Sequence, residues 1–186
     1  MVSKITTGKV RFSYVFLFEP RAPKDKPDGE KKYSVTLLIP KSDKATVKAL
    51  RDAEKQCAEE NAGVWGGRVP TNLKSIIHDG DVEADLETNP EYAGHFYMTV
   101  SAGERYKPNL VDARMQEIID PQDLYSGCYG RVSLMPFAYN FQGNKGVSFG
   151  LRNVQVLQKG EPLGGISRAE DDFDAVDVDD DEDGLI

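Results

Sequence analysis

Aromatic and basic residues are interleaved in two parts of this sequence. The segment GKVRFSYVFLF, residues 8–18, holds four aromatic residues and two bases, and CYGRVSLMPFAYNF, residues 128–141, holds four aromatic residues beside Arg131. Aromatic faces stack on unpaired nucleic-acid bases at about 1 to 3 kcal/mol each, and cations neutralise phosphate. The combination predicts a surface able to hold one nucleic-acid strand with little dependence on its sequence.

The same aromatic residues could instead fill a hydrophobic core. Phenylalanine has no polar atom, so we assign most phenylalanines to the core. Tyrosine is more available for stacking, because it can keep its hydroxyl in water while offering its ring. The expected stacking residues are therefore Tyr14, Tyr129 and Tyr139. Trp65, in the glycine-rich VWGGR, is either a further stacking platform or a lid on one end of the fold.

Charge is distributed unevenly along the chain. Residues 1–24 and 131–168 each contain five bases and one acid, whereas residues 76–95 contain six acids and no Lys or Arg. If the basic segments meet in the fold, they form a positive face that the formal net charge of -8 conceals. The expected phosphate contacts come from these segments and from the proline-rich loop that follows residue 20: Lys9, Arg11, Arg21, Lys24, Lys26, Lys31, Lys32, Arg131, Lys145 and Arg152.

The chain ends in the acidic sequence EDDFDAVDVDDDEDGLI, which has ten acids and no base. The rest of the chain carries 23 bases and 21 acids, a net charge of +2. Such a run of like charge buries too little apolar area to fold, so we divide the chain into a folded domain, residues 1–168, and a disordered tail, residues 169–186.

We expect this tail to compete with DNA for the basic surface and to recruit other proteins. The residues expected to act in the tail are Phe173, Asp179, Asp180, Asp181, Glu182, Asp183, Leu185 and Ile186. A tail that only adds solubility is the alternative, because acidic runs often do no more than that.

Catalytic and metal-binding patterns are missing from the sequence. His78 and His95 are the only histidines, and neither lies in a Ser, Cys or HExxH arrangement. The alternating acids of residues 78–85 depart from a calcium-binding loop, which requires glycine and glutamate where this chain has Ala84 and Pro90. We expect no enzymatic activity, no metal and no cofactor. A nuclease built from carboxylates alone is a weaker alternative.

The sequence also predicts a cytoplasmic protein with no membrane contact. It has only two cysteines, Cys57 and Cys128, which are too few for a disulfide framework and are expected to be buried free thiols. No apolar stretch is long enough to span a bilayer, and the segment MVSKITTGKVRF lacks a signal-peptide apolar region.

Strand patterns outnumber helical ones. Alternating apolar residues predict strands at residues 8–18, 33–39 and 94–102, and a long hairpin formed by residues 128–141 and 146–158. We expect Pro20 to end the first strand. One helix is expected after Ser42, with apolar residues at helical spacing from Val47 to Cys57 and a stop at Gly63. Short strands with one helix favour a small barrel over a parallel sheet.

Three long segments resemble one known family. They are FEPRAPKDKPDGEKKYSVTLLIPKSD, VWGGRVPTNLKSIIHDGD and LYSGCYGRVSLMPFAYNFQGNKGVSFGLRNVQVLQKGEPLGG, and the likeness spans most of residues 8–165. They resemble the phage single-stranded DNA-binding proteins that carry an oligonucleotide-binding (OB) barrel. The resemblance implies a mainly β fold with one principal helix, in which a five-stranded Greek-key barrel of OB type has elaborated loops and precedes the disordered acidic tail.

The resemblance also implies a function. It implies largely sequence-independent binding of single-stranded DNA in phage DNA replication, recombination and repair inside the bacterial host cell. The net charge of +2 outside the tail is lower than that of a strongly basic binder, so duplex DNA is expected to bind more weakly. Replication or recombination proteins are the expected partners of the tail, and a homodimer is left open. The competing function is that of an acidic interaction protein, a DNA mimic or inhibitor whose active element is the tail itself.

Overall fold

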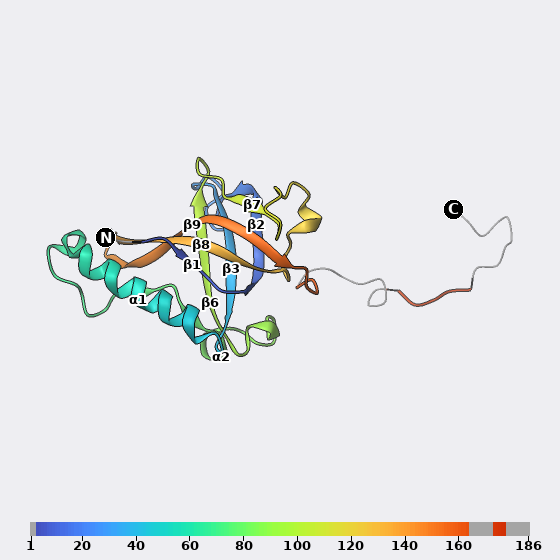
Figure 1. Cartoon of the computed structure of the whole chain (residues 1–186), viewed down its shortest axis with the longest axis horizontal. Coiled ribbons are helices and arrows are strands. Elements are labelled where there is room, and N and C mark those ends of the chain that lie inside the picture. The colour runs from blue at the N-terminus through green and yellow to red at the C-terminus, as the bar shows by residue number, and fades with distance from the viewer. Residues whose placement is uncertain (1–2, 164–172, 178–186) are drawn as a thin grey trace.

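The computed structural model describes residues 3–163 and 173–177, and its framework is a ring of five strands (Figure 1). The five strands are β2 (Val10–Arg21), β3 (Lys32–Pro40), β6 (His95–Gly103), β8 (Tyr129–Phe141) and β9 (Asn144–Gln158). Hydrogen-bonded pairing runs from β2 through β3, β6, β9 and β8 back to β2. This ring confirms the prediction of a mainly β fold.

Short elements extend the ring at its edges. Strand β1 (Ile5–Thr6) pairs with β8, β5 (His78–Asp79) pairs with β6, and both β4 (Lys74–Ser75) and β7 (Asn109–Val111) pair with β9. The acidic segment after β5 contains the one-turn helix α2 (Gly80–Glu83) and the 3₁₀ turn η2 (Pro90–Tyr92), and η3 (Pro121–Asp123) precedes β8. These elements are the elaborated loops that the sequence predicted.

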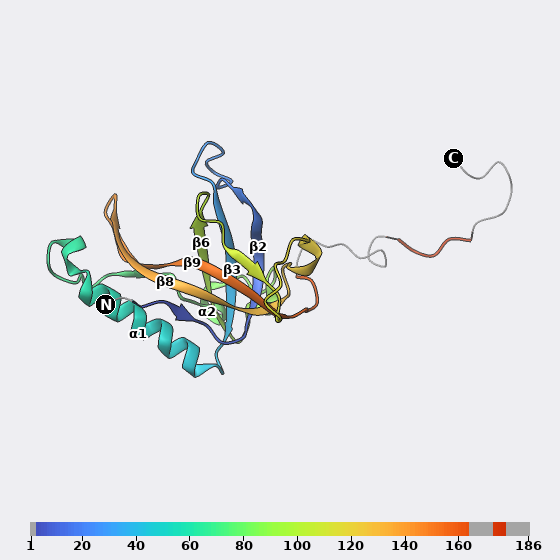
Figure 2. The same ribbon diagram turned by 45° about the horizontal axis from the view of Figure 1, so that its top comes forward.

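The loop between β2 and β3 and the tip of the β8–β9 hairpin project to the same side of the molecule, away from the long helix (Figure 2). The hairpin closes through a two-residue turn, Gln142 and Gly143, with φ angles of 51° and 81°. Both angles lie in the left-handed region that such tight hairpin turns require. The structure therefore confirms the predicted long hairpin.

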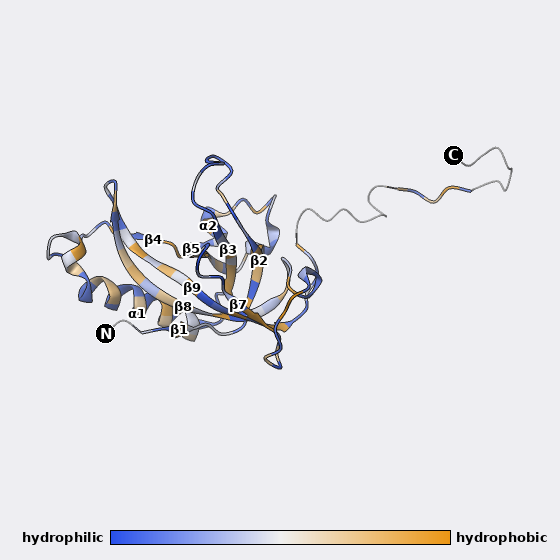
Figure 3. Ribbon diagram, turned by 90° about the horizontal axis from the view of Figure 1, so that it is seen from above, coloured by the Kyte–Doolittle hydropathy of each residue, from blue (hydrophilic) through white to orange (hydrophobic). Residues whose placement is uncertain are grey.

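The principal helix is α1, Lys44–Glu60, and the structure confirms it. Its N-cap is Asp43 rather than Ser42, because the Asp43 side chain accepts the hydrogen bond of the Thr46 N–H. Leu50 and Cys57 are among its buried residues, and Figure 3 shows hydrophilic and hydrophobic residues along its length. The chain continues past Gly63 through the 3₁₀ turn η1, Ala62–Trp65.

The main hydrophobic core is formed by one face of each ring strand. Val35 and Leu37 of β3 and Met98 and Val100 of β6 are all buried in it. Their sequence neighbours of the other parity, such as Thr99, point to the outer face. This confirms the predicted alternation in β6. Cys57 and Cys128 are buried and free, as expected.

Strand β2 does not keep the strict alternation that its sequence suggested. Ser13 pairs with Thr36, but the next pair is Phe16 with Ser34, so one extra residue is inserted into β2. Tyr14, with a φ of 46°, lies in this β-bulge. Phe12 faces the core before the bulge, and after it Leu17 does so instead. The bulge therefore moves Phe16 from the predicted core parity to the outer face.

Two further expectations concern the ends of segments. Strand β2 does not end at Pro20 but continues to Arg21. Its pairing with β3 is irregular between Phe16 and Arg21, so the missing N–H of Pro20 does not interrupt a regular series of hydrogen bonds between the strands. In the predicted tail, Phe173 is 74% exposed and Val176 79%. The boundary at residue 168 and the predicted tail residues Asp179, Asp180, Asp181, Glu182, Asp183, Leu185 and Ile186 lie outside the described residues.

Within residues 3–163 and 173–177, no helix is long and apolar enough to cross a membrane.

Candidate nucleic-acid interface

A single row of cross-strand partners runs over the outer face of the ring. Phe16 of β2 pairs with Ser34 of β3, and Ser34 pairs with Ser101 of β6. Ser101 pairs with Gly150 of β9, and Gly150 pairs with Met135 of β8. Cross-strand partners point to the same side of a sheet. Segments far apart in the sequence therefore share one continuous face, and three of the five residues along this row are small.

The β8–β9 hairpin extends this face beyond the ring. Its next outward pairs are Phe137 with Ser148, Tyr139 with Gly146, and Phe141 with Asn144. The alternate residues Ala138 and Val147 pack instead against the Trp65 cluster next to α1. Phe137 is 47% exposed and Phe141 is 66% exposed. Three aromatic side chains and small partners therefore cover the outer face of the hairpin.

A hollow of about 470 Å³ lies at the β2, β3 and β6 end of this face. Four aromatic rings line it, together with hydroxyl side chains on its floor and a wall from the acidic segment. The lining residues are Tyr14, Phe16, Arg21, Ser34, Thr36, Glu83, Ala84, Asp85, Asn89, Tyr92, Tyr97 and Thr99. Concave sites that combine aromatic rings with a few polar groups are typical of ligand binding.

The aromatic rings of the hollow are held in place by neighbouring residues. The Tyr97 ring centre lies 5.1 Å from those of both His78 and Tyr92. The Tyr92 hydroxyl donates to Ser13 Oγ at 3.2 Å, and the Tyr14 hydroxyl donates to Asn89 Oδ1 at 3.0 Å. Burial raises the pKa of both Tyr92 and Tyr97, so both phenols are neutral at physiological pH.

Basic side chains stand at the end of the hollow nearest the β2–β3 loop. The guanidinium of Arg21 covers the Phe16 ring at 3.5 Å from its centre, and Arg21 pairs with Lys32 across the strands. Lys32 in turn pairs with Gly103, so the turn after β6, with Arg105 and Lys107, lies at the same end. The face thus combines aromatic rings, a small-residue floor and cations, which are the components of a single-strand binding surface.

Comparison with known proteins agrees with this chemistry. Residues 3–185 match the family described as "Enterobacter phage Enc34, ssDNA-binding protein". The chain belongs to this family. No match was found among curated protein sequences.

Solved structures of similar proteins share the fold of this family member. The single-stranded DNA-binding protein of bacteriophage Enc34 in complex with ssDNA is 27% identical, with a TM-score of 0.72 over 87% of this chain and 89% of that chain. Its C-terminally truncated form is 25% identical, with a TM-score of 0.71 over 86% and 88%. The single-stranded DNA-binding protein gp2.5 of bacteriophage T7 is 14% identical, with a TM-score of 0.63 over 100% and 99%, which shows a common fold.

Membership of the Enc34 family supports two predictions. The family consists of phage single-stranded DNA-binding proteins, which are not enzymes, in agreement with the sequence prediction. The shared fold is OB-like, and of the five-stranded Greek-key barrel that was expected, the structure shows a ring of five paired strands. Among the described residues of this Enc34-type protein, no group of His, Cys, Asp and Glu is arranged to hold a metal ion.

The structure brings some of the predicted contact residues of this Enc34-family member together. Tyr14 and Arg21 line the hollow, and Tyr139 lies on the outer face of the hairpin. Arg152 is exposed two positions after Gly150, and because β6 and β9 are parallel at this point it lies beside the turn that follows Gly103. The predicted bases of the β2–β3 loop are exposed at the same end: Lys24, Lys26, Lys31 and Lys32.

A second group of predicted residues lies elsewhere on this Enc34-type fold. Lys9 and Arg11 both lie over the Tyr129 ring, at 5.3 and 5.1 Å from its centre. Arg11 also donates to the backbone carbonyls of Gly127 and Glu161. Arg131 is bonded to Gln155 on the β8–β9 face. Lys9, Arg11 and Tyr129 lie near the end of β9 and the segment that follows it, whereas Arg131 lies beside β9 itself. None of these four residues lines the hollow.

Two predicted residues belong to the helix side of the hairpin. Trp65 is only 9% exposed, packs with Cys57 and Val147, and donates its indole N–H to the Tyr139 carbonyl. The Trp65 ring therefore has little surface open to solvent for stacking on a base. Lys145 pairs with Asn140, whose amide bonds the Val64 carbonyl, so Lys145 also faces η1 rather than the outer face.

Sequence reasoning missed several residues of the candidate interface. Tyr97 and Thr99 on β6 and the Thr36–Thr99 hydroxyl contact of 2.8 Å were not identified. Phe16, Phe137 and Phe141 were assigned with the core phenylalanines but lie on the outer face. The sequence feature that could have identified them is an alternation in β3 and β6, where Ser, Thr and Tyr alternate with buried aliphatic residues. The polar residues of this alternation mark the outer face.

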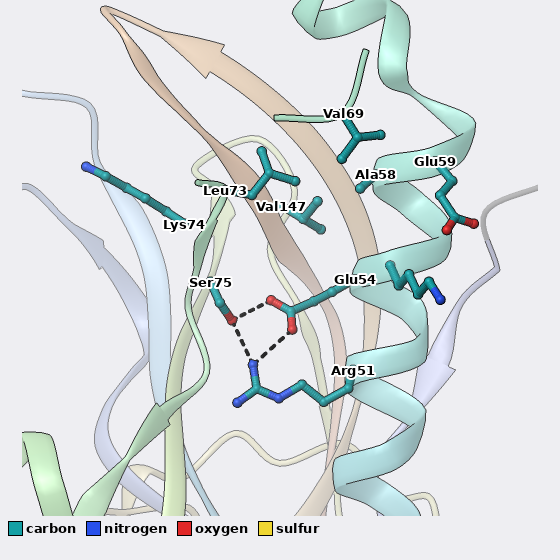
Figure 4. Close-up of a pocket in the computed structure, with 10 residues that line it drawn as sticks. Arg51, Glu54, Ala58, Glu59, Val69, Leu73, Lys74, Ser75 and Val147 are labelled. Atoms are coloured by element: carbon teal, nitrogen blue, oxygen red, sulfur yellow. Dashed lines mark hydrogen bonds and ion pairs between the residues drawn. The ribbon is translucent and has the colours of Figure 1, made fainter. Parts of the chain in front are cut away.

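Another pocket lies on the opposite side of the hairpin, between α1, β4 and β9 (Figure 4). Ala58, Val69, Leu73 and Val147 form its apolar lining. Arg51, Glu54 and Ser75 bond one another along its edge. This pocket lacks aromatic rings, so we do not include it in the candidate interface.

Proposed function

We propose that this protein binds single-stranded DNA along the outer face defined above and so protects single strands during phage DNA replication, recombination and repair. The observation that carries the proposal is the unbroken row from Phe16 to Met135, which joins the aromatic hollow to the aromatic hairpin. The likeness of this chain to the single-stranded DNA-binding protein of bacteriophage Enc34, whose structure is known in complex with ssDNA, supports it.

Contacts along this face explain low sequence preference. Aromatic rings stack on any base, and cations near the β2–β3 loop neutralise phosphate without reading bases. Ser34, Ser101 and Gly150 leave room for a strand to pass between the two aromatic groups. Duplex DNA keeps its bases stacked and out of reach of these rings, so we expect it to bind more weakly.

The acidic tail is proposed to compete with DNA for this face and to recruit replication or recombination proteins. Leu163, the last described residue before the tail, lines a second hollow with Tyr14, Phe16 and Asn89. Residue 163 therefore lies beside the aromatic hollow, and we infer that the ten acids that follow it in the sequence compete for the nearby cations. The exposed Phe173 and the apolar Leu185 and Ile186 are the proposed partner contacts.

A titration of a fluorescent oligonucleotide at two salt concentrations, with and without divalent metal, tests the main proposal. Binding that weakens steeply with salt and leaves the oligonucleotide intact is the expected result. Absence of binding would favour an acidic interaction protein, and a shortened oligonucleotide would indicate a nuclease.

Truncation after residue 168 tests the role of the tail. It changes the net charge from -8 to +2, so affinity for the oligonucleotide should rise, most of all at low salt. Unchanged affinity at low salt would show that the tail does not compete for the face. Partner recruitment is tested separately, by comparing the two chains in binding to phage replication proteins.

A further inference from the structure

The aromatic hollow has an acidic wall, which is unexpected on a surface that must hold a polyanion. Glu83 and Asp85 line it, opposite the single cation Arg21. They belong to the segment 76–95, which has six acids and no Lys or Arg. A phosphate group placed against this wall would be repelled, whereas a group that donates hydrogen bonds would be attracted.

Both carboxylates are positioned by the local backbone. The Asp79 N–H donates to Glu83 Oε2 at 3.0 Å, and the Glu87 N–H donates to Asp85 Oδ1 at 3.1 Å. The Asp79 backbone bond lowers the pKa of Glu83, and the Thr88 hydroxyl bond lowers that of Asp85. Both groups are therefore ionised at neutral pH, and a carboxylate has about four acceptor positions, so each can accept further hydrogen bonds.

The rest of the hollow suits the flat face of a base. Tyr14, Phe16, Tyr92 and Tyr97 supply rings from three different elements, and the volume of about 470 Å³ exceeds that of one nucleobase. A base bound in the hollow would stack on these rings, and its phosphates would be attracted to the cations near the β2–β3 loop. The sugar–phosphate backbone would then run away from the acidic wall. The edge of the inserted base then meets the carboxylates.

We propose that this hollow is a base-binding subsite that favours bases with an exocyclic amino group over thymine. This inference rests on the proposed binding of single-stranded DNA and adds a preference to it. Cytosine presents an amino donor at the position where thymine presents a carbonyl acceptor. Facing Glu83 or Asp85, the amino group gains a charge-assisted hydrogen bond, whereas the thymine carbonyl is repelled.

The test compares labelled homopolymers of cytosine and thymine, about ten nucleotides long, which is within the usual site size of such folds. The measured quantity is the ratio of the thymine Kd to the cytosine Kd. Because homopolymers differ in their own stacking, the informative value is the change in this ratio between proteins. The groove variant combines Glu83→Gln with Asp85→Asn, and the matched control combines Asp52→Asn with Glu59→Gln on exposed positions of α1.

We expect the ratio to fall about fivefold in the groove variant and to stay the same in the control. A second measurement uses the native protein and an oligonucleotide in which 2-pyrimidinone replaces cytosine, since this base lacks only the amino group. Its affinity should be about fivefold below that of the cytosine oligonucleotide. This second measurement uses only the native protein, so it does not depend on whether the groove variant folds.

The outcomes separate the subsite from the proposed function. If the native protein binds the cytosine and 2-pyrimidinone oligonucleotides with equal affinity, the base preference is overturned while single-strand binding stands. If it binds none of the three oligonucleotides, the proposed function fails as well. A ratio that persists in the folded groove variant overturns the role of Glu83 and Asp85.

Discussion

The guanidinium carbon of Arg21 lies 3.5 Å from the centre of the Phe16 ring. Both residues belong to β2, and the bulge at Tyr14 is what turns Phe16 to the outer face beside Arg21. The stacked pair joins an aromatic surface to a positive charge at the edge of the hollow. One structural unit can therefore contact a base and a neighbouring phosphate.

Replacing Arg21 tests this pair. Arg21→Ala should weaken single-strand binding and reduce the slope of log affinity against log salt by about 0.7, because one phosphate contact is lost. Titrations at several salt concentrations measure both effects. Lys48→Ala, an exposed lysine on α1, is the control and should change neither quantity. An unchanged slope in Arg21→Ala would remove this residue from the interface.

The hairpin aromatic residues allow stacking to be separated from packing. Phe141 is 66% exposed, so Phe141→Ala should change the free energy of unfolding by no more than about 0.5 kcal/mol. Its single-strand binding should nevertheless weaken by about 1 to 3 kcal/mol, as expected for a lost stacking platform. Thermal unfolding and oligonucleotide titration of the same sample provide the comparison. Normal binding would show that Phe141 contacts no base.

Tyr139 lies on the same face as Phe141, but its ring also packs against the protein. Its ring lies against Gly146, where an added Cβ would come within 2.7 Å of the hydroxyl oxygen. Tyr139→Ala should therefore lower both the melting temperature and the affinity. A variant that melts as the native protein does but binds weakly would instead assign Tyr139 to stacking alone.

The close approach of strands at Gly130 predicts a stability effect without a direct binding role. A Cβ at this position would lie 2.2 Å from the Gln155 carbonyl oxygen and 2.7 Å from the Phe12 ring. Gly130→Ala should lower the free energy of unfolding by about 1 to 3 kcal/mol, because the core cannot accept the added volume without moving. Gly150→Ala, whose nearest contact is 3.6 Å, is the control for urea unfolding. Equal stability of the two variants would contradict the packing at Gly130.

The Lys41 ion pairs predict a dependence of stability on acid pH. Lys41 Nζ lies 2.6 Å from Asp79 and 2.7 Å from Asp81, and these bonds lower the pKa of both carboxyl groups. Their contribution is thus present above the unfolded pKa of about 3.9 and is lost as pH falls through the lower folded values. Lys41→Met should be less stable than the native protein at pH 7, with the difference shrinking below about pH 4. Urea unfolding across this range measures it, and a constant difference would contradict the linkage.

Local features of this protein were predictable from its sequence. The helix α1 follows from apolar residues at helical spacing, and the β8–β9 hairpin follows from two alternating runs joined by a glycine-containing turn. These patterns depend on neighbours within a few residues of one another. The acidic character of the end of the chain is likewise a property of composition alone. The sequence was therefore sufficient for the class of fold, the basic loop and the expectation of a nucleic-acid surface.

Which residues belong to the candidate interface depended on the tertiary structure. Phe16, Ser101 and Gly150 lie in three distant parts of the sequence, and only strand register places them in one row. A single inserted residue at Tyr14 reverses which side chains of β2 face outward, and local alternation does not reveal where such an insertion occurs. The hidden position of Trp65 likewise results from the packing of η1 on the hairpin. Which aromatic residues face the core and which remain free to stack was decided by pairing between distant strands, because the side of a strand on which a residue lies is set by register rather than by residue type.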